Sequence, residues 1–197
     1  MTRIIIPHRG LGIAKTRLAS VLSPEERLAL ARRLLLHVLE AAAASGAEVC
    51  VISPDPALGE LVEPAGARMV VQRGMGLNAG LEQARSAALA EGIPCLAVLH
   101  GDLPNITPAD VRALLEAVDG GRAVAIAPDR AGTGTNGLAL RPADVIGFAF
   151  GPESFAAHRT AASAAGATVS VVERPGLAFD LDTPADLVRW LDMGDAA

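Results

Sequence analysis

The sequence predicts an α/β fold, a mostly parallel mixed sheet flanked by helices, and two observations indicate it. Short apolar runs alternate with longer amphipathic segments along the 197 residues, which is the pattern of strands joined by crossover helices. The runs are apolar throughout, as in strands that are covered on both faces. A chain of this length buries roughly 70% of its extended surface, so the fold needs no disulfide or structural metal.

Seven strands are predicted from short apolar runs that are bounded by turn-forming residues. In chain order they span residues 3–6, 48–53, 67–72, 95–100, 123–127, 137–141 and 168–173. Both cysteines, Cys50 and Cys95, lie in these runs. We interpret them as small buried hydrophobic residues, because a disulfide framework or a metal site needs more of them.

Five helices are predicted from apolar residues at helical spacing, over residues 23–44, 77–90, 108–118, 154–164 and 184–191. Three of them share one start signal, in which Ser23, Thr107 or Thr183 precedes a proline, with an acid at the third helical position. The hydroxyl caps the first backbone N–H groups, and proline fits the first helical position. Local chemistry therefore places these helix starts.

Composition excludes several classes of function. The 17 basic and 22 acidic side chains give a net charge of −5, and aromatic residues make up 3%. Neither value suits a nucleic-acid binder, which needs cations for the backbone or aromatic rings for stacking. The apolar run at residues 4–6 is too short for a signal peptide, and no segment is long enough to cross a bilayer. We therefore expect a cytoplasmic protein that acts on small molecules.

A basic, glycine-containing loop follows the first predicted strand. It carries Arg9, Gly10, Lys15 and Arg17, and Lys15 is the single lysine of the chain. In a parallel sheet this loop emerges at the carboxyl edge, where ligands bind. Glycine lets backbone N–H groups approach an anion, and the cations neutralise phosphate oxygens. The alternative is a solvated basic loop, since the spacing matches neither the P-loop nor the dinucleotide fingerprint.

Three aspartates are candidate metal ligands. Asp102 directly follows the buried strand at 95–100, and Asp180 and Asp182 precede the last helix. A carboxylate at the end of a central strand presents a hard oxygen ligand to Mg²⁺. Asp180 and Asp182 alternate, so one is expected to face Asp102 while the other caps or braces the loop. Carboxylates on one magnesium beside a basic loop suggest transfer at a nucleoside triphosphate.

Two further loops could bind substrate. Gly76 and Asn78 open the helix at 77–90, and Asn78 could reach a base edge or a ribose, or only cap the helix. Thr135 and Asn136 end a segment in which Gly and Thr alternate. Such a segment offers backbone and hydroxyl donors to an oxyanion, although an ordinary glycine-rich turn is the alternative.

The helix at 154–164 starts with a candidate anion site. Gly151 and Ser154 lie at its N-terminus, where backbone N–H groups attract negative charge. The alternative is simple capping of the helix by Ser154. His158 lies one turn further on, where an anion contact is one interpretation and a place on the helix surface is the favoured one.

In this order, the clusters resemble the guanylyltransferase family of coenzyme F420 biosynthesis, also described as 2-phospho-L-lactate or phosphoenolpyruvate guanylyltransferases. The resemblance covers nearly the whole chain. GTGTN at 132–136 together with FGPESF at 150–155 is its most specific part. Two segments depart from the expected pattern, at residues 8–10 and 100–101.

The resemblance implies a nucleotidyltransferase fold related to glycosyltransferase A and Rossmann-like folds, in one domain over 1–197. The nucleotide half would span 1–127, the acceptor half 128–179, and a metal loop and helix 180–197. Mg²⁺ would be the cofactor. The implied site residues are Lys15, Arg17 and Asp102 for catalysis; Arg9, Gly10, Lys15, Arg17, Gly76 and Asn78 for the nucleotide; Thr135, Asn136, Gly151 and Ser154 for the acceptor; and Asp102, Asp180 and Asp182 for the metal.

We therefore expect transfer of GMP from GTP to a small phosphorylated carboxylic acid, with release of pyrophosphate. The acid could be phosphoenolpyruvate, 2-phospho-L-lactate or 3-phosphoglycerate, and a homodimer stays open. The alternatives are a nucleotidyltransferase that uses CTP or a molybdopterin acceptor, and a non-catalytic nucleotide-binding module. A dinucleotide-dependent oxidoreductase is disfavoured because its glycine fingerprint is absent.

Overall fold

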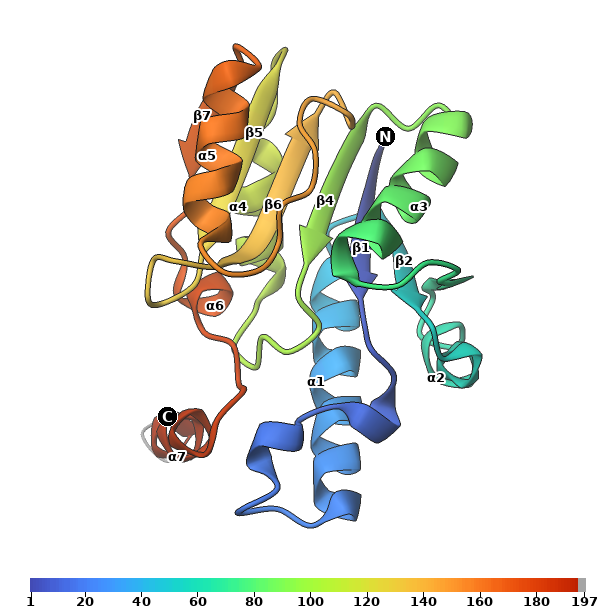
Figure 1. The fold of residues 1–197 in the computed structure, drawn as a ribbon, viewed down its shortest axis with the longest axis vertical. Coiled ribbons are helices and arrows are strands. Elements are labelled where there is room, and N and C mark those ends of the chain that lie inside the picture. The colour runs from blue at the N-terminus through green and yellow to red at the C-terminus, as the bar shows by residue number, and fades with distance from the viewer. Residues whose placement is uncertain (195–197) are drawn as a thin grey trace.

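The computed structural model describes residues 1–194 and is built on one seven-stranded sheet (Figure 1). The strand order is β3-β2-β1-β4-β6-β5-β7. Only β6 runs antiparallel to its neighbours, β4 and β5, so the predicted mostly parallel mixed sheet is confirmed. The strands are β1 Thr2–Pro7, β2 Glu48–Ser53, β3 Arg68–Val71, β4 Cys95–Leu99, β5 Ala123–Pro128, β6 Thr135–Arg141 and β7 Thr168–Val171.

Helices cover both faces of the sheet (Figure 1). All five predicted helices are present, and two short ones, α2 and α6, were not predicted because four residues are too few for a periodic pattern. The last three residues of the predicted C-terminal segment 180–197 lie outside the described residues. The helices are α1 Pro24–Ala43, α2 Gly59–Val62, α3 Leu77–Ala90, α4 Pro108–Glu116, α5 Ser154–Ala164, α6 Pro175–Ala178 and α7 Pro184–Gly194.

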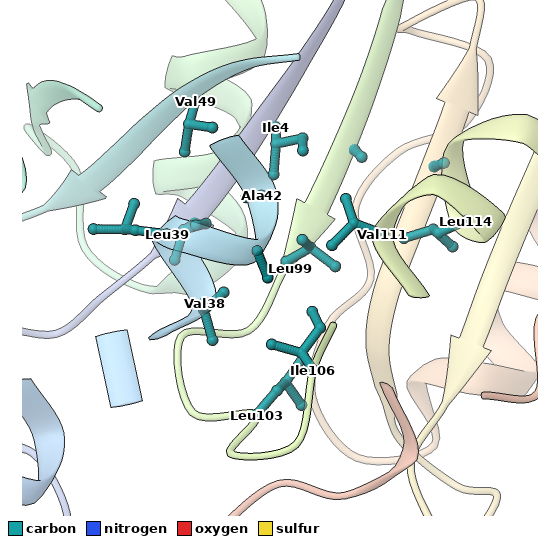
Figure 2. Close-up of a cluster of buried hydrophobic side chains, with 14 of the residues drawn as sticks. Ile4, Val38, Leu39, Ala42, Val49, Leu99, Leu103, Ile106, Val111 and Leu114 are labelled. Carbon is teal, nitrogen blue, oxygen red and sulfur yellow. The ribbon is translucent and has the colours of Figure 1, made fainter. Parts of the chain in front are cut away.

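Two apolar clusters pack on the two faces of the sheet. Helices α1, α2, α4 and α6 contribute to the first cluster, part of which is drawn in Figure 2. Leu99 and Leu114 in that cluster are fully buried, and each such side chain contributes about 1.5–3 kcal/mol to folding. Helices α3 and α5 contribute to the second cluster on the opposite face. Both faces of the central strands are therefore covered, as their continuous apolar runs predicted.

The predicted helix caps are confirmed. Ser23 accepts from the backbone N–H of Glu26 at the start of α1, and Thr107 accepts from that of Asp110 at the start of α4. The packing of α6 against α4 depends on a glycine. The carboxylate of Asp110 in α4 is buried, and a side chain at Gly176 of α6 would collide with it. Glycine is therefore the residue that lets α6 pack this closely against α4.

One edge of the sheet collects loops from both halves of the chain. β1, β2 and β4 are mutually parallel through β1, so the loops after β1 and β4 emerge together. Because β6 is antiparallel to β4, its first residue, Thr135, lies at the same edge. The register of β6 against β5 shifts beside Pro128, which leaves Asn136 as the extra residue of a bulge. A bulge re-aims its side chain.

The prediction that Thr135 and Asn136 lie in a loop before the strand is wrong, because β6 starts at Thr135 rather than at Gly137. Polar residues at a strand start carry no apolar pattern, so the prediction began the strand too late. In the part of the chain that the structure describes, no helix is both long and apolar enough to cross a membrane.

Candidate active site

The ammonium group of Lys15 joins two of the predicted carboxylates. Its Nζ atom donates hydrogen bonds to Asp102 Oδ2 at 2.8 Å and to Asp182 Oδ1 at 3.0 Å. Only 6% of the Lys15 side chain is exposed. Lys15 lies in the loop after β1, Asp102 after β4 and Asp182 just before α7. Three loops that are far apart in the sequence therefore meet at this edge of the sheet.

The charges in this cluster hold one another in the ionised state. Burial acts to lower the pKa of Lys15, but the carboxylates of Asp102 and Asp182 outweigh it and raise that pKa above its ordinary value. Burial likewise acts to raise the pKa of Asp102, and the ammonium of Lys15 and the ring of His100 bring it below its ordinary value. Lys15 and Asp102 are therefore both charged at neutral pH.

Asp180 and Asp182 take different partners, as their alternation predicted. The segment is anchored between them, where the backbone N–H of the fully buried Leu181 donates to the carbonyl of Asp102 at 3.1 Å. Asp182 faces Lys15, whereas Asp180 Oδ1 accepts from the amide of Asn136 at 3.3 Å. Burial and the charge of Asp102 raise the pKa of Asp180, so Asp180 also lies within the electrostatic reach of Asp102.

One carboxylate oxygen of Asp102 has no hydrogen-bond partner among the described residues. This atom, Oδ1, is buried, and a buried carboxylate oxygen without a partner is costly unless a cation compensates it. Within residues 1–194, no group of three or more His, Cys, Asp or Glu side chains is arranged so that it could hold a metal ion, and the ammonium of Lys15 lies between Asp102 and Asp182. The donors are hard oxygen atoms of the kind that Mg²⁺ prefers.

The remaining basic loop residues are placed differently. Arg17 is 74% exposed, and its guanidinium lies 3.6 Å from Asp182. Arg9 is exposed. Gly10 has a positive φ of 102°, and its backbone N–H donates to His8 Nδ1 at 3.0 Å. A Cβ at Gly10 would approach Asp55 Cβ to 3.0 Å, so glycine is required for packing as well as for conformation.

Asn78 forms two hydrogen bonds with the backbone of the loop before α5. Its amide donates to the carbonyl of Phe150 at 3.0 Å, and its Oδ1 accepts from the N–H of the same residue at 2.9 Å. The N-cap of α3 is Gly76, with a φ of 88°, so the alternative that Asn78 caps the helix is wrong. Asn78 therefore links the nucleotide half to the acceptor half, and a contact with the nucleotide stays a prediction.

His158 is a functional candidate that the sequence interpretation ranked below a place on the helix surface. The favoured prediction, a place on the helix surface, is wrong because His158 is fully buried. Its Nδ1 atom lies 3.1 Å from Thr135 Oγ1, and its Nε2 atom accepts from the N–H of Ala149 at 3.0 Å. The spacing in the sequence could have predicted this burial, because residues four apart lie on one face of a helix. Ser154, His158 and Ala162 have that spacing and form the buried face of α5.

The other residues predicted to bind the acceptor are Asn136, Gly151 and Ser154. The amide of Asn136 donates to the carbonyl of Leu177 at 3.0 Å as well as to Asp180. The N-cap of α5 is Glu153, with no side-chain hydrogen bond to the helix, so simple capping by Ser154 is not observed. Ser154 is the first helical residue and is buried. Gly151 has a positive φ of 134° in the turn before it.

A cavity of about 580 Å³ lies outside the cluster of Lys15, Asp102 and Asp182. It opens between α1 and α7, where Arg33 stacks over the ring of Trp190. Among the described residues, its lining includes Pro104 but none of the predicted site residues. The candidate site is therefore the open edge of the sheet, where the charged groups meet.

Comparison with known proteins decides the family. A family model described as "Guanylyl transferase CofC like" matches residues 2–196. The chain belongs to this family. The family and the guanylyltransferase class that the sequence predicted are therefore confirmed.

Similar curated proteins carry matching names. A phosphoenolpyruvate guanylyltransferase from Rubrobacter xylanophilus is 47% identical over 94% of this chain and 91% of its own length. One from Sphaerobacter thermophilus is 45% identical over 95% of this chain and 91% of its own length. A 3-phospho-D-glycerate guanylyltransferase from Phenylobacterium zucineum is 40% identical over 94% of this chain and 87% of its own length.

Solved structures confirm the fold of this CofC-like chain. A putative nucleotide-diphospho-sugar transferase from Desulfovibrio desulfuricans superimposes with a TM-score of 0.79 at 20% identity, over 94% of this chain and 84% of the other. A nucleotidyl transferase from Methanothermobacter gives 0.72 at 21% identity, over 98% and 97%. The predicted nucleotidyltransferase fold is therefore confirmed.

Proposed function

We propose that the chain transfers GMP from GTP to the phosphate of phosphoenolpyruvate, within coenzyme F420 biosynthesis. Family membership supports guanylyl transfer, and relatives at 47% and 45% identity carry the name phosphoenolpyruvate guanylyltransferase. The structural observation that carries the proposal is the contact of Lys15 with Asp102 and Asp182. It joins a cation for the triphosphate to carboxylates for a metal at one sheet edge.

The proposed reaction is an in-line displacement at phosphorus. A phosphate oxygen of the acid forms a bond to the α-phosphorus of GTP, and the bond from that phosphorus to the oxygen bridging the β-phosphorus breaks. Pyrophosphate leaves with the electron pair. The attacking oxygen is already anionic at neutral pH, so no general base is needed. The protein contributes alignment and charge neutralisation.

The nucleotide is assigned to the loops after β1 and β3. Lys15 and Arg17 would hold the triphosphate, and a point charge such as an ammonium suits several oxygens at once. Arg9 is exposed at the same edge and would add charge for the phosphates. The turns at Gly10 and Gly76 and the amide of Asn78 would border the rest of the nucleotide.

The acceptor is assigned to the far side of the same edge. Ser154 is the first residue of α5, an 11-residue helix, and Gly151 lies in the turn before it. The N-terminus of such a helix attracts carboxylate and phosphate charge. Thr135 and Asn136 at the start of β6 would add a hydroxyl and an amide. Asn136 already contacts Asp180, so the acceptor side and the carboxylates are in contact.

Asp102 and Asp182 would hold Mg²⁺, with Asp180 completing the set. The unpartnered oxygen of Asp102 and the raised pKa of Asp180 both suit a site that binds a cation. When bound, Mg²⁺ supplies neutralisation of the charge that builds on the phosphates. Lys15 would then be free to turn from the carboxylates toward the triphosphate.

We also propose that the protein acts in the cytoplasm, where GTP is available.

A substrate panel tests the proposal. Pyrophosphate release is measured with GTP, CTP or ATP against phosphoenolpyruvate, 2-phospho-L-lactate and 3-phosphoglycerate, with Mg²⁺ present. We expect GTP with phosphoenolpyruvate to give the highest kcat/KM. A clear preference for 3-phosphoglycerate, the acid named for the relative from Phenylobacterium zucineum, would replace the acceptor. A preference for CTP would overturn the nucleotide assignment.

A further inference from the structure

The ring of His158 has no role in the proposed reaction, although it contacts Thr135, one of the residues assigned to the acceptor. It lies on the buried face of α5, one turn after Ser154. Its two nitrogen atoms contact two different segments: Thr135 at the start of β6 and Ala149 in the loop before α5. These segments border the proposed acceptor site on both sides.

The contacts fix the proton on the ring. The backbone N–H of Ala149 can only donate, so Nε2 must offer its lone pair. Burial lowers the pKa of His158 to about 4, so the ring is neutral at pH 7 and its one proton is on Nδ1. That proton is directed at Thr135 Oγ1, 3.1 Å away. Thr135 therefore accepts from His158, and its own hydroxyl proton is left for another partner.

The loop beside His158 is held from two helices. Ala149 N–H donates to His158 of α5, and the next N–H, of Phe150, donates to Asn78 of α3. The ring of Phe150 also meets the His158 ring edge-on, with 4.9 Å between centroids. Two successive N–H groups thus fix the loop immediately before Gly151, at the entrance to α5.

We propose that His158 is a positioning residue for the acid acceptor: its neutral ring fixes the loop at Ala149 and leaves the hydroxyl of Thr135 as a hydrogen-bond donor to the acceptor's anionic oxygens. The inference rests on the proposed placing of the acceptor beside Thr135 and Ser154. His158 acts through these groups and does not itself touch the reacting atoms.

Two conservative variants separate the two arms of the ring. In His158→Gln the side-chain oxygen reaches the place of Nε2 and keeps an acceptor for Ala149, but the donor to Thr135 is lost. In His158→Asn the amide nitrogen takes the place of Nδ1 and keeps that donor, but Ala149 loses its acceptor. Thr135→Val removes the hydroxyl with little change of volume.

Steady-state kinetics with GTP and phosphoenolpyruvate tests the proposal. We expect each single variant to raise the KM for the acid about tenfold, the loss of one hydrogen bond to a charged group, with the KM for GTP unchanged. Adding Thr135→Val to His158→Gln should cost little more than Thr135→Val alone, because both remove the same arm. Adding it to His158→Asn should multiply the two effects.

A matched control addresses stability. Ala162→Gly alters the next buried residue of α5, weakening the helix without touching the loop. An equal rise in the acid's KM from Ala162→Gly, or an equal rise in the KM for GTP from the His158 variants, would overturn the proposal. So would full multiplication of His158→Gln with Thr135→Val.

A second readout is independent of the substrate assignment. In ¹⁵N-labelled protein at pH 7, the ring of His158, assigned by its loss in His158→Gln, should be neutral with the proton on Nδ1. A proton on Nε2, or on both nitrogens, would overturn the inference. If the unaltered enzyme turns over no acid at all, the proposed function fails instead, and the ring measurement still decides the state of His158.

Discussion

At the scale of single residues, the site centres on Lys15. It is the one lysine beside 16 arginines, and its compact ammonium contacts two carboxylates at 2.8 and 3.0 Å. A planar guanidinium suits one carboxylate in a bidentate contact, whereas an ammonium serves several oxygens as a point charge. The structure thus gives a physical reason for a lysine here.

Removing this charge should affect metal binding before any substrate is present. In Lys15→Met, Asp102 and Asp182 lose their shared cation, so we expect Mn²⁺ to bind the nucleotide-free protein roughly tenfold more tightly. Turnover should fall by about 100-fold, because charge on the departing pyrophosphate goes unneutralised. Calorimetry with Mn²⁺ and initial rates measure the two effects.

Arg17→Met is the matched control for Lys15, because Arg17 is exposed and, among residues 1–194, its guanidinium forms one ion pair, with Asp182 at 3.6 Å. We expect it to leave Mn²⁺ affinity nearly unchanged. Equal metal affinity in the unaltered protein and Lys15→Met would contradict the placing of the metal between Asp102 and Asp182.

Asp102→Asn should abolish turnover while the fold stays intact. The amide keeps the shape of the side chain but loses the charge that attracts Mg²⁺, so we expect a fall of at least about 100-fold. Asp55→Asn is the control, since Asp55 lies near Gly10 at the same edge and an amide oxygen can still accept from Ala57. Near-normal turnover in Asp102→Asn would remove Asp102 from the metal site.

Burial of His158 makes stability depend on pH. Its pKa is about 4 in the folded protein and about 6.5 in an unfolded chain. Between these values the unfolded chain binds more protons, so acid lowers the free energy of unfolding, by about 2 kcal/mol between pH 7 and pH 5. Above pH 7 the contribution is constant.

Urea unfolding of the unaltered protein and of His158→Gln, at pH 7 and pH 5, isolates this contribution as a difference. We expect the advantage of the unaltered protein over the variant to shrink by that amount at pH 5. A difference that is the same at both pH values would show that His158 is not held neutral by burial.

At the scale of elements, the long and periodic segments were predictable and the short ones were not. The five predicted helices and seven predicted strands are present, because each has an apolar pattern or a cap. The four-residue helices α2 and α6 lack a periodic pattern. The bulge that re-aims Asn136 depends on the register of β6 against β5, which no local signal in the sequence specifies.

Asp186, the acid in the first turn of α7, should both stabilise the start of that helix and position a site residue. Asp186 accepts from the N–H of Thr183 at 2.9 Å and of Asp182 at 3.3 Å. We expect Asp186→Ala to lower stability by about 0.5–2 kcal/mol, as the loss of a cap does, and also to weaken Mn²⁺ binding, because Asp182 is released.

The equivalent cap of α4 gives the comparison for Asp186. Asp110 makes the same contacts with Thr107, and it pairs with Arg174 rather than with the site. Asp110→Ala should lower the melting temperature and leave Mn²⁺ affinity unchanged. If both alanine variants, or neither, change Mn²⁺ affinity, the link between the α7 cap and Asp182 fails.

At the scale of the whole molecule, strand direction decides which parts of the site a sequence can predict. Lys15 and Asp102 follow parallel strands, so their meeting at the carboxyl edge follows from the rule for α/β sheets. Thr135 is the first residue of the antiparallel strand β6, so it is the start of this strand, not its end, that lies at the same edge. The sequence does not show that reversal, and it therefore could not place Thr135 against His158.

The central claim is that a phosphate oxygen of the acid attacks the α-phosphorus of GTP, and isotope transfer tests it most directly. Phosphoenolpyruvate labelled with ¹⁸O in its non-bridging phosphate oxygens is incubated with GTP, Mg²⁺ and the enzyme. The masses of the products are then measured by mass spectrometry to locate the label. We expect one diphosphate-linked guanosine product that retains all of the label, together with an equal amount of unlabelled pyrophosphate. Label in pyrophosphate, or GTP consumed to GDP or GMP with the acid unchanged, would contradict the account.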